Sequence, residues 1–284
     1  MPTSDGAPIR RRLAQGHPVL GGWVQVCHPA VARVMARSGM DFVTLDVEHG
    51  LVDLQPGAAV IDAVRVAGSV PLVRLAGNQY SDNKRWLDAG AEGLIAPLVM
   101  DADQARELVE SAKYPPEGRR GVGYCHANDY GLDFDAYIRR ANDSVLVCVQ
   151  IEHIRAIENL EAILDVPGID AAFIGPYDLS ASMGLTGQFH HPEFTGALDR
   201  FLAVCRAKRV APGRHIVQPD TAALTRAIEE GYQLIGYSLD VTMLAAMCRS
   251  GVQTFRELVA GKAGQAPQAP GAPGRVAPIT PDRP

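Results

Sequence analysis

Charged side chains and a histidine follow several short apolar segments of the sequence, and their types suit acid–base and metal chemistry. They are Asp46 and His49 after residues 42–45, Arg74 near the end of residues 72–75, Glu152 after residues 145–151, and Asp178 after residues 171–174. If these segments are parallel strands of one barrel, their carboxyl ends meet on one face, where barrel enzymes carry their catalytic groups. The pattern therefore predicts one site.

The carboxylates of Glu152 and Asp178 are the candidate metal ligands. A glutamate directly after a long apolar segment is seldom idle, because a carboxylate near a core needs partners. Carboxylate oxygens with few basic neighbours suit Mg²⁺ or Mn²⁺, and such an ion would polarise a 2-oxo acid through its carbonyl and carboxylate oxygens. Gln150 lies two residues before Glu152 in a predicted strand and therefore shares its face.

The segment Gly175-Pro176-Tyr177-Asp178 leads into a predicted helix and is a candidate substrate-binding turn. Backbone N–H groups at the start of a helix have no partner within the helix and can bind a carboxylate. Pro176 has no N–H, so Tyr177 and Asp178 are the expected donors.

Arg74 and His49 are the candidates for charge stabilisation and proton transfer. A fixed guanidinium beside a carbonyl oxygen can stabilise a developing enolate, although the same arginine could instead form a structural ion pair. An imidazole can be neutral near pH 7 and accept a proton from a hydroxyl group. Asp46 and Asp88 are nearby acids that could orient His49.

The segments that must position these residues alternate between apolar strands and amphipathic helices. Predicted strands are residues 20–25, 42–45, 72–75, 93–96, 145–151, 171–174, 209–211 and 234–237, with helices between them and a last helix over residues 241–262. Continuous apolar strands are expected when both faces of a sheet are buried. Repeated strand–helix units predict an α/β fold, a single (β/α)8 TIM barrel, with an open doubly wound sheet as the alternative.

Composition and charge exclude several other classes of protein. The net charge of −5 and the lack of a basic stripe argue against a nucleic-acid partner. No apolar stretch is long enough for a membrane helix. The cysteines are odd in number and widely spaced, which favours neither a zinc cluster nor disulfides and predicts a cytoplasmic protein.

The predicted organisation is one domain with two dissimilar ends. Residues 1–16 are polar and are expected to be a flexible N-terminal segment, residues 17–262 form the barrel, and residues 263–284 are a disordered tail rich in Pro, Gly and Ala.

The motifs that carry these residues resemble the HpcH/HpaI aldolase family of metal-dependent class II pyruvate aldolases, over roughly residues 15–260. The motifs are FVTLDVEHG (42–50), PLVRLAG (71–77), WLDAGAEGLIAPLV (86–99), YPPEGRRGVG (114–123), VQIEHIRAIENLEAIL (149–164), GIDAAFIGPYDLSASMG (168–184) and GYQLIGYSLDVTML (231–244). The resemblance implies a TIM barrel that forms a homo-hexamer, a trimer of dimers, with the C-terminal helix exchanged between subunits.

The resemblance also assigns roles to the candidate residues. Glu152 and Asp178 would hold a divalent metal, Mg²⁺ or Mn²⁺ with Co²⁺ as a further candidate. His49 would be the general base supported by Asp88, and Asp46 would lie beside that base. Arg74 would stabilise the enolate. Gln150 and residues 175–177 would line the substrate pocket.

The implied reaction is retro-aldol cleavage of a 4-hydroxy-2-oxo acid into pyruvate and an aldehyde through a metal-bound pyruvate enolate. Decarboxylation of oxaloacetate-like 2-oxo acids on the same site is an alternative, as is a non-catalytic metal-binding barrel. A thioester lyase fits the short motifs less well. Arg214 and His215, placed after the seventh predicted strand, depart from the pattern of simpler aldolases. They either face the distal end of the substrate, where they could bind an acidic or phosphorylated tail, or are surface residues.

Overall fold

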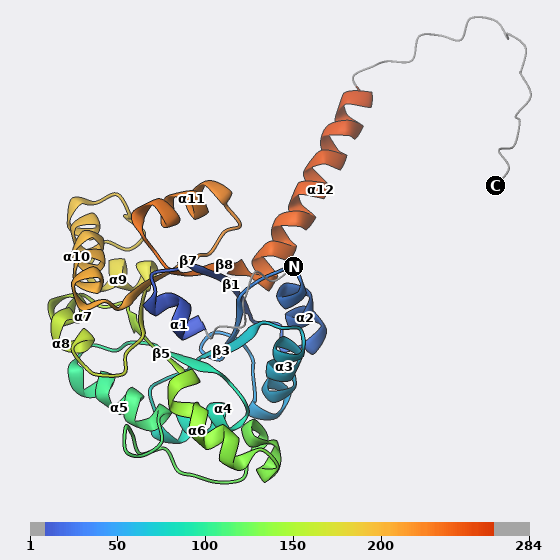
Figure 1. Cartoon of the computed structure of the whole chain (residues 1–284). Helices are drawn as coiled ribbons and strands as arrows, with labels where there is room; N and C mark the ends of the chain where they lie inside the picture. Colours follow the sequence, from blue (N-terminus) through green and yellow to red (C-terminus); the bar gives the residue numbers. More distant parts are fainter. Residues whose placement is uncertain (1–8, 264–284) are drawn as a thin grey trace, which may run out of the picture. The chain divides into compact units, whose positions relative to one another are not determined.

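Eight parallel strands close into a barrel in sequence order in the computed structural model, which describes residues 9–263 (Figure 1). The strands are β1 (Val19–Val24), β2 (Phe42–Asp46), β3 (Val70–Arg74), β4 (Gly93–Ala96), β5 (Leu146–Ile151), β6 (Ala171–Ile174), β7 (Ala211–Ile216) and β8 (Leu234–Leu239). The predicted (β/α)8 barrel is therefore confirmed, and the open doubly wound sheet is excluded.

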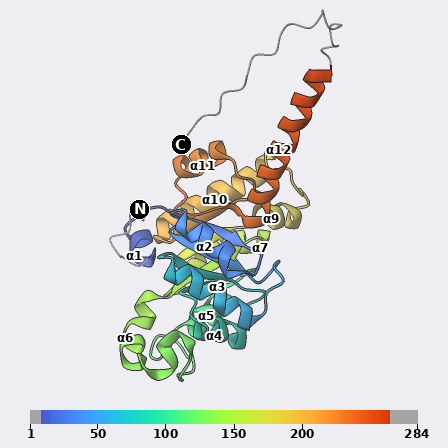
Figure 2. The same ribbon diagram turned by 90° about the vertical axis from the view of Figure 1, so that its right-hand side faces the viewer.

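The helices lie around the outside of the strands (Figures 1 and 2). They are α2 (Pro29–Arg37), α3 (Leu54–Val66), α4 (Tyr80–Asp88), α5 (Ala102–Ala112), the 3₁₀ helix η1 (His126–Gly131), α6 (Phe134–Ser144), α7 (Ile154–Glu158), α8 (Leu160–Leu164), α9 (Pro176–Ser182), α10 (Pro192–Lys208) and α11 (Thr221–Glu230).

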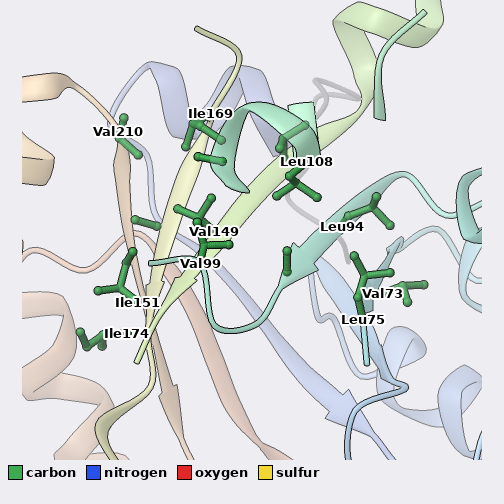
Figure 3. Close-up of a cluster of buried hydrophobic side chains, with 14 of the residues drawn as sticks. Val73, Leu75, Leu94, Val99, Leu108, Val149, Ile151, Ile169, Ile174 and Val210 are labelled. Atoms are coloured by element: carbon green, nitrogen blue, oxygen red, sulfur yellow. The ribbon is translucent and has the colours of Figure 1, made fainter. Parts of the chain in front are cut away.

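Two apolar clusters, one outside the strands and one inside, decide which way each strand residue faces. Val147, Val149 and Ile151 of β5 pack against the surrounding helices in the outer cluster, part of which Figure 3 shows. Leu146 and Cys148 belong to the inner cluster. Because side chains alternate along a strand, Gln150 and Glu152 continue the inner face toward the carboxyl end of the barrel.

The seventh strand differs from its prediction. The expected strand at residues 209–211 was wrong in its bounds, because β7 runs from Ala211 to Ile216 and pairs with β6 and β8. Its sequence APGRHI lacks the apolar character used to find strands. Gly213 is required there, since a Cβ atom at this position would lie 2.4 Å from Cδ2 of Phe173.

A short helix, α1 (Ile9–Ala14), packs against the inner cluster at the amino-terminal end of the barrel. Its Ile9 and Leu13 are buried, and Arg10 and Arg12 pair with Asp170 and Asp41, which immediately precede β6 and β2. Figure 2 shows α1 and α9 on opposite sides of the strands. This ordered helix differs from the flexible segment expected over residues 1–16, because two buried side chains and two ion pairs hold it; residues 1–8 lie outside the described part.

Most of the last helix, α12 (Asp240–Ala263), belongs to a second compact unit that begins at Leu244. Its exposed apolar residues are Leu244, Met247, Val252, Phe255, Leu258 and Val259. None of the helices between residues 9 and 263 has the length and apolar character needed to cross a membrane. The tail predicted for residues 263–284 falls outside the described residues from 264 onward.

Candidate active site

A cavity of about 220 Å³ opens among the side chains at the carboxyl ends of the strands. The predicted site residues that line it are His49, Arg74, Gln150, Gly175, Pro176, Tyr177 and Asp178. Further lining residues are Trp23, Gln25, Phe173, Ile174, His215, Val217 and Leu239. Segments far apart in the sequence therefore meet in one cavity, as the barrel prediction requires.

Arg74 is fixed by two carboxylates that follow the second strand. Its Nε and Nη2 donate to Oδ1 and Oδ2 of Asp46 at 2.9 and 2.7 Å, and its Nη1 lies 3.3 Å from Oε2 of Glu48. Gln25 also donates to Asp46, which is completely buried. A bidentate guanidinium–carboxylate pair fixes both distance and plane, so the orientation of Arg74 toward the cavity is set by Asp46.

Opposing effects act on the two carboxylates beside Arg74. Burial alone would raise the pKa of Asp46, but the hydrogen bonds and charge of Arg74, with smaller contributions from Gln25 and His49, hold it below its ordinary value. Burial dominates at Glu48 and raises its pKa, although the charges of Arg74 and His49 oppose the shift. Asp46 is thus held ionised, whereas Glu48 is a poorly compensated carboxyl group.

Glu48 was not among the residues predicted for the site. It lies two positions after Asp46 in the DVEH motif, a spacing that could have indicated a shared face if the strand continues. Its Oε2 is buried without a hydrogen-bond partner among the described residues, because the contact with Arg74 lacks hydrogen-bond geometry.

Glu152 lies at the carboxyl end of β5 with 2% of its surface exposed. Its Oε1 accepts a hydrogen bond from the backbone N–H of Leu98 at 2.7 Å, and its Oε2 accepts one from Gln150. Burial has the largest effect on the pKa of Glu152, and the charges of Glu48 and Asp178 add to it. Together they raise this pKa to about 7, although the two hydrogen bonds lower it. The carboxylates of Glu48, Glu152 and Asp178 therefore lie close enough to repel one another.

Asp178 occupies the first turn of α9, which starts directly after β6. Gly175 precedes this helix and has to be a glycine, because a Cβ atom there would come within 2.7 Å of the Glu152 side chain. The absent side chain allows the turn to approach Glu152 closely. The ring of Tyr177 packs edge-on against Phe189, and 57% of its surface is exposed.

His49 and Asp88 lie in different surroundings. The backbone N–H of His49 donates to Asp46, and Nε2 of its exposed ring lies 4.0 Å from Glu48. Asp88, at the end of α4, pairs with Lys84 at 2.6 Å and with the buried Arg120 at 2.7 Å. No contact joins Asp88 to His49 within the described part of this chain, so the sequence-based pairing of the two stays a prediction.

The carboxylates of the site fit a divalent cation by their chemistry. Among residues 9–263, no group of three or more acidic, histidine or cysteine side chains is close enough to hold an ion. A magnesium-type ion often takes only one or two carboxylates and completes its shell with water and substrate oxygens. Orphaned oxygens of Glu48 and Gln150, together with the repulsion felt by Glu152, are the features that a nearby cation would relieve.

A wall of aromatic rings completes the cavity and was not predicted from the sequence. The rings of Trp23 and His215 stack at 4.5 Å and an interplanar angle of 18°, and Phe173 lies 5.1 Å from Trp23. His215 enters the cavity, whereas Arg214 pairs with Glu230 at 2.8 Å and lies over the ring of Tyr232. Alternation along β7 therefore separates the two residues that sequence analysis had grouped together.

Comparison with known proteins places these features in a family context. Residues 20–246 match the family model described as HpcH/HpaI aldolase/citrate lyase. A 4-hydroxy-2-oxo-heptane-1,7-dioate aldolase from Salmonella paratyphi B is 38% identical over 234 residues, which are 82% of this chain and 88% of that protein. Solved HpcH/HpaI family structures from Burkholderia cenocepacia and Desulfitobacterium hafniense have TM-scores of 0.83 and 0.82 at 35% and 33% identity, covering 87% and 88% of this chain and 98% of each of theirs.

Proposed function

This chain belongs to the HpcH/HpaI aldolase/citrate lyase family and is a carbon–carbon lyase, and we propose that it cleaves a 4-hydroxy-2-oxo acid into pyruvate and an aldehyde. One observation carries the proposal. The carboxylates of Glu48, Glu152 and Asp178 lie near one another, and Glu48 also lies beside the guanidinium of Arg74, which Asp46 holds in place. This arrangement offers a cation site next to a fixed positive group, which is what enolate formation from a 2-oxo acid requires.

Glu152 and Asp178 would hold the divalent metal, with Mg²⁺ or Mn²⁺ as the ions that suit carboxylate oxygens and Co²⁺ as a further candidate. When bound, the ion supplies Lewis-acid polarisation of the 2-oxo group. The amide nitrogen of Gln150 donates to Glu152, and its carbonyl oxygen is buried without a partner among the described residues. Gln150 and the backbone of Gly175, Pro176 and Tyr177 would border the pyruvate half of the substrate.

Proton transfer and charge stabilisation fall to two residues of this chain. His49 would accept the proton of the C4 hydroxyl as the C3–C4 bond breaks and the aldehyde forms. The electron pair of that bond passes to the pyruvate half, and the guanidinium of Arg74 would stabilise the negative charge on the enolate oxygen. Asp46 keeps Arg74 in its orientation and anchors the backbone of His49. Protonation of the enolate carbon then gives the methyl group of pyruvate.

The proposal also covers the oligomeric state and the cellular compartment of the protein. We propose a homo-hexamer, a trimer of dimers, in which α12 is exchanged between subunits; the exposed apolar residues of α12 support this. All five cysteines are free thiols, which supports work in the reducing cytoplasm. Asp88 would act in support of His49 only if another conformation or another subunit brings the two together.

The proposal is tested by exchange of the methyl protons of pyruvate in deuterated water. We expect exchange that a chelator abolishes and that added Mg²⁺ or Mn²⁺ restores. Glu152→Gln and Asp178→Asn should each lower the exchange rate at least about 100-fold. Glu161→Gln is a matched control, because Glu161 pairs with Arg200 at the surface of α8 and α10.

Wild-type exchange in either carboxylate variant would rule out the metal assignment. Absence of exchange with every metal would leave a thioester lyase or a non-catalytic barrel. Release of carbon dioxide from oxaloacetate without any aldol product, when exchange is present, would instead favour the decarboxylase reading of the same site.

A further inference from the structure

We propose that the Trp23–His215 wall of the cavity is the subsite for the aldehyde half of the substrate, and that it selects a short aldehyde carrying a hydroxyl group over one carrying a carboxylate. The inference rests on the proposed aldolase function and adds the substrate class. It does not depend on the residues assigned to the pyruvate half.

The first argument is the tautomer of His215. Its Nε2 lies 3.3 Å from the backbone carbonyl oxygen of Ser238, which can only accept a hydrogen bond. In the neutral ring Nε2 therefore carries the proton, and Nδ1 is left as an acceptor. Nδ1 has no hydrogen-bond partner among residues 9–263, and the side chain lines the cavity. An acceptor in this position calls for a donor on the substrate.

The neutral state of His215 is set by its surroundings. Burial lowers its pKa to about 4, the carbonyl of Ser238 and the carboxylate of Asp46 oppose the shift, and the charge of Arg74 adds to it. The stacked ring of Trp23 covers one face of the imidazole and excludes water from it. The ring consequently stays uncharged at neutral pH and cannot serve as a cation for an acidic tail.

The second argument is the packing of the buried Trp23 ring against His215. Only 1% of the Trp23 surface is exposed, and Nε1 has no acceptor within the described part of the chain. Gly236 accommodates this ring, since a Cβ atom there would lie 2.2 Å from Cζ3 of Trp23. A hydroxyl group can donate to the unpaired Nδ1 of His215 without bringing a charge to this buried pair of rings. A carboxylate only accepts and would meet the lone pair of Nδ1.

The third argument is the charge of the site. Asp46 and Glu48 both pair with the guanidinium of Arg74, and Glu152 and Asp178 lie near Glu48. Arg214, the nearest further cation along β7, is turned outward to Glu230. A second carboxylate on the substrate would gain no cation from the described residues and would be repelled by the acidic ones.

The test is aldol addition of pyruvate to a series of aldehydes by the full-length, metal-loaded enzyme. In each addition the enolate carbon bonds to the aldehyde carbon, and the aldehyde oxygen takes a proton. We expect kcat/KM for lactaldehyde to exceed that for propanal about tenfold, the value of one hydrogen bond, and to exceed that for succinic semialdehyde by more. Equal values for lactaldehyde and propanal, or a preference for the semialdehyde, would overturn the inference.

Two matched variants connect the preference to His215. His215→Leu should bring the ratio of kcat/KM for lactaldehyde to that for propanal close to one, whereas His17→Leu, an exposed histidine before β1, should leave it unchanged. The ratio is measured within one preparation, so loss of folded protein does not affect it. An unchanged ratio in His215→Leu counts against the inference. Pyruvate proton exchange without any hydroxyl preference would sink this inference alone, whereas absence of exchange in the wild type would sink the proposed function.

Discussion

The protonation state of each carboxyl group at the candidate site is set by the balance between its burial and its hydrogen-bonding and charged partners. Asp46 has a bidentate partner and is held ionised, while Glu152 lies in an equally buried position near other carboxylates and is held toward its protonated form. Two acids of similar chemistry are thereby assigned different roles, one as an anchor for Arg74 and the other as a candidate metal ligand. Carboxyl groups with perturbed pKa values that lie close together are typical of functional sites.

The buried imidazole of His215 predicts a measurable pH dependence of stability. Its pKa of about 4 in the folded protein lies below the ordinary value of 6.5, so below pH 6.5 the unfolded chain binds a proton that the folded one does not. The stability that the neutral imidazole allows is therefore fully present above pH 6.5, and it is lost as the pH falls toward 4. The wild-type free energy of unfolding should fall relative to that of His215→Leu by about 1 kcal/mol per pH unit near pH 5 to 6.

Urea unfolding with a chelator present, at several pH values, measures this difference. Carboxyl groups titrate in both proteins and cancel in the comparison. His17→Leu should run parallel to the wild type, because His17 is exposed. Parallel curves for wild type and His215→Leu would show that the imidazole is not kept neutral by burial.

Among the elements, α1 and β7 show how packing overrides local sequence. The helix α1 is only six residues long, too short to be stable alone, and its two buried side chains close the amino-terminal end of the barrel. The strand β7 contains Pro, Gly, Arg and His but is paired on both sides. Its register is what brings His215 into the cavity and leaves Arg214 outside.

The packing of α1 gives a prediction at this scale. Leu13 is 4% exposed and belongs to the inner apolar cluster, so Leu13→Ala should lower the free energy of unfolding by about 2 to 4 kcal/mol. Arg11→Ala on the exposed side of α1 should change it by less than about 0.5 kcal/mol. Chemical denaturation of both variants provides the measurement. A loss for Leu13→Ala no larger than that for Arg11→Ala would mean that α1 does not contribute to the core.

At the scale of the whole molecule, α12 carries a row of exposed apolar residues. Leu244, Met247, Phe255 and Leu258 fall on one side of a helix with roughly 3.6 residues per turn. An apolar stripe of this length is typical of a surface that another chain covers. The proposed exchange of α12 between subunits would bury it.

Phe255→Glu combined with Leu258→Glu should therefore reduce the mass of the assembly in light scattering, because it places charges in an apolar contact. Arg256→Glu supplies a matched control on the same helix, changing charge without touching an apolar residue. An unchanged mass in the double variant, with the helix still formed, would contradict the proposed role of α12.

The sequence alone was enough to predict the closed barrel and most of its strands, because apolar periodicity and glycine-ended helices are local signals. It also placed the candidate site at the carboxyl ends of the strands, which share one face in a parallel barrel. Arg74, Gln150 and Asp178 line the cavity there, whereas Glu152, Asp46 and Asp88 are not among its lining residues. What a residue contacts there was decided only by the tertiary structure. The partner of Asp46, the buried and unpartnered oxygen of Glu48, the position of Asp88 beside Arg120 and the stacking of His215 on Trp23 depend on strand register and on burial. These contacts arise from pairing and packing between distant segments, so the apolar pattern of one segment alone does not specify its partners.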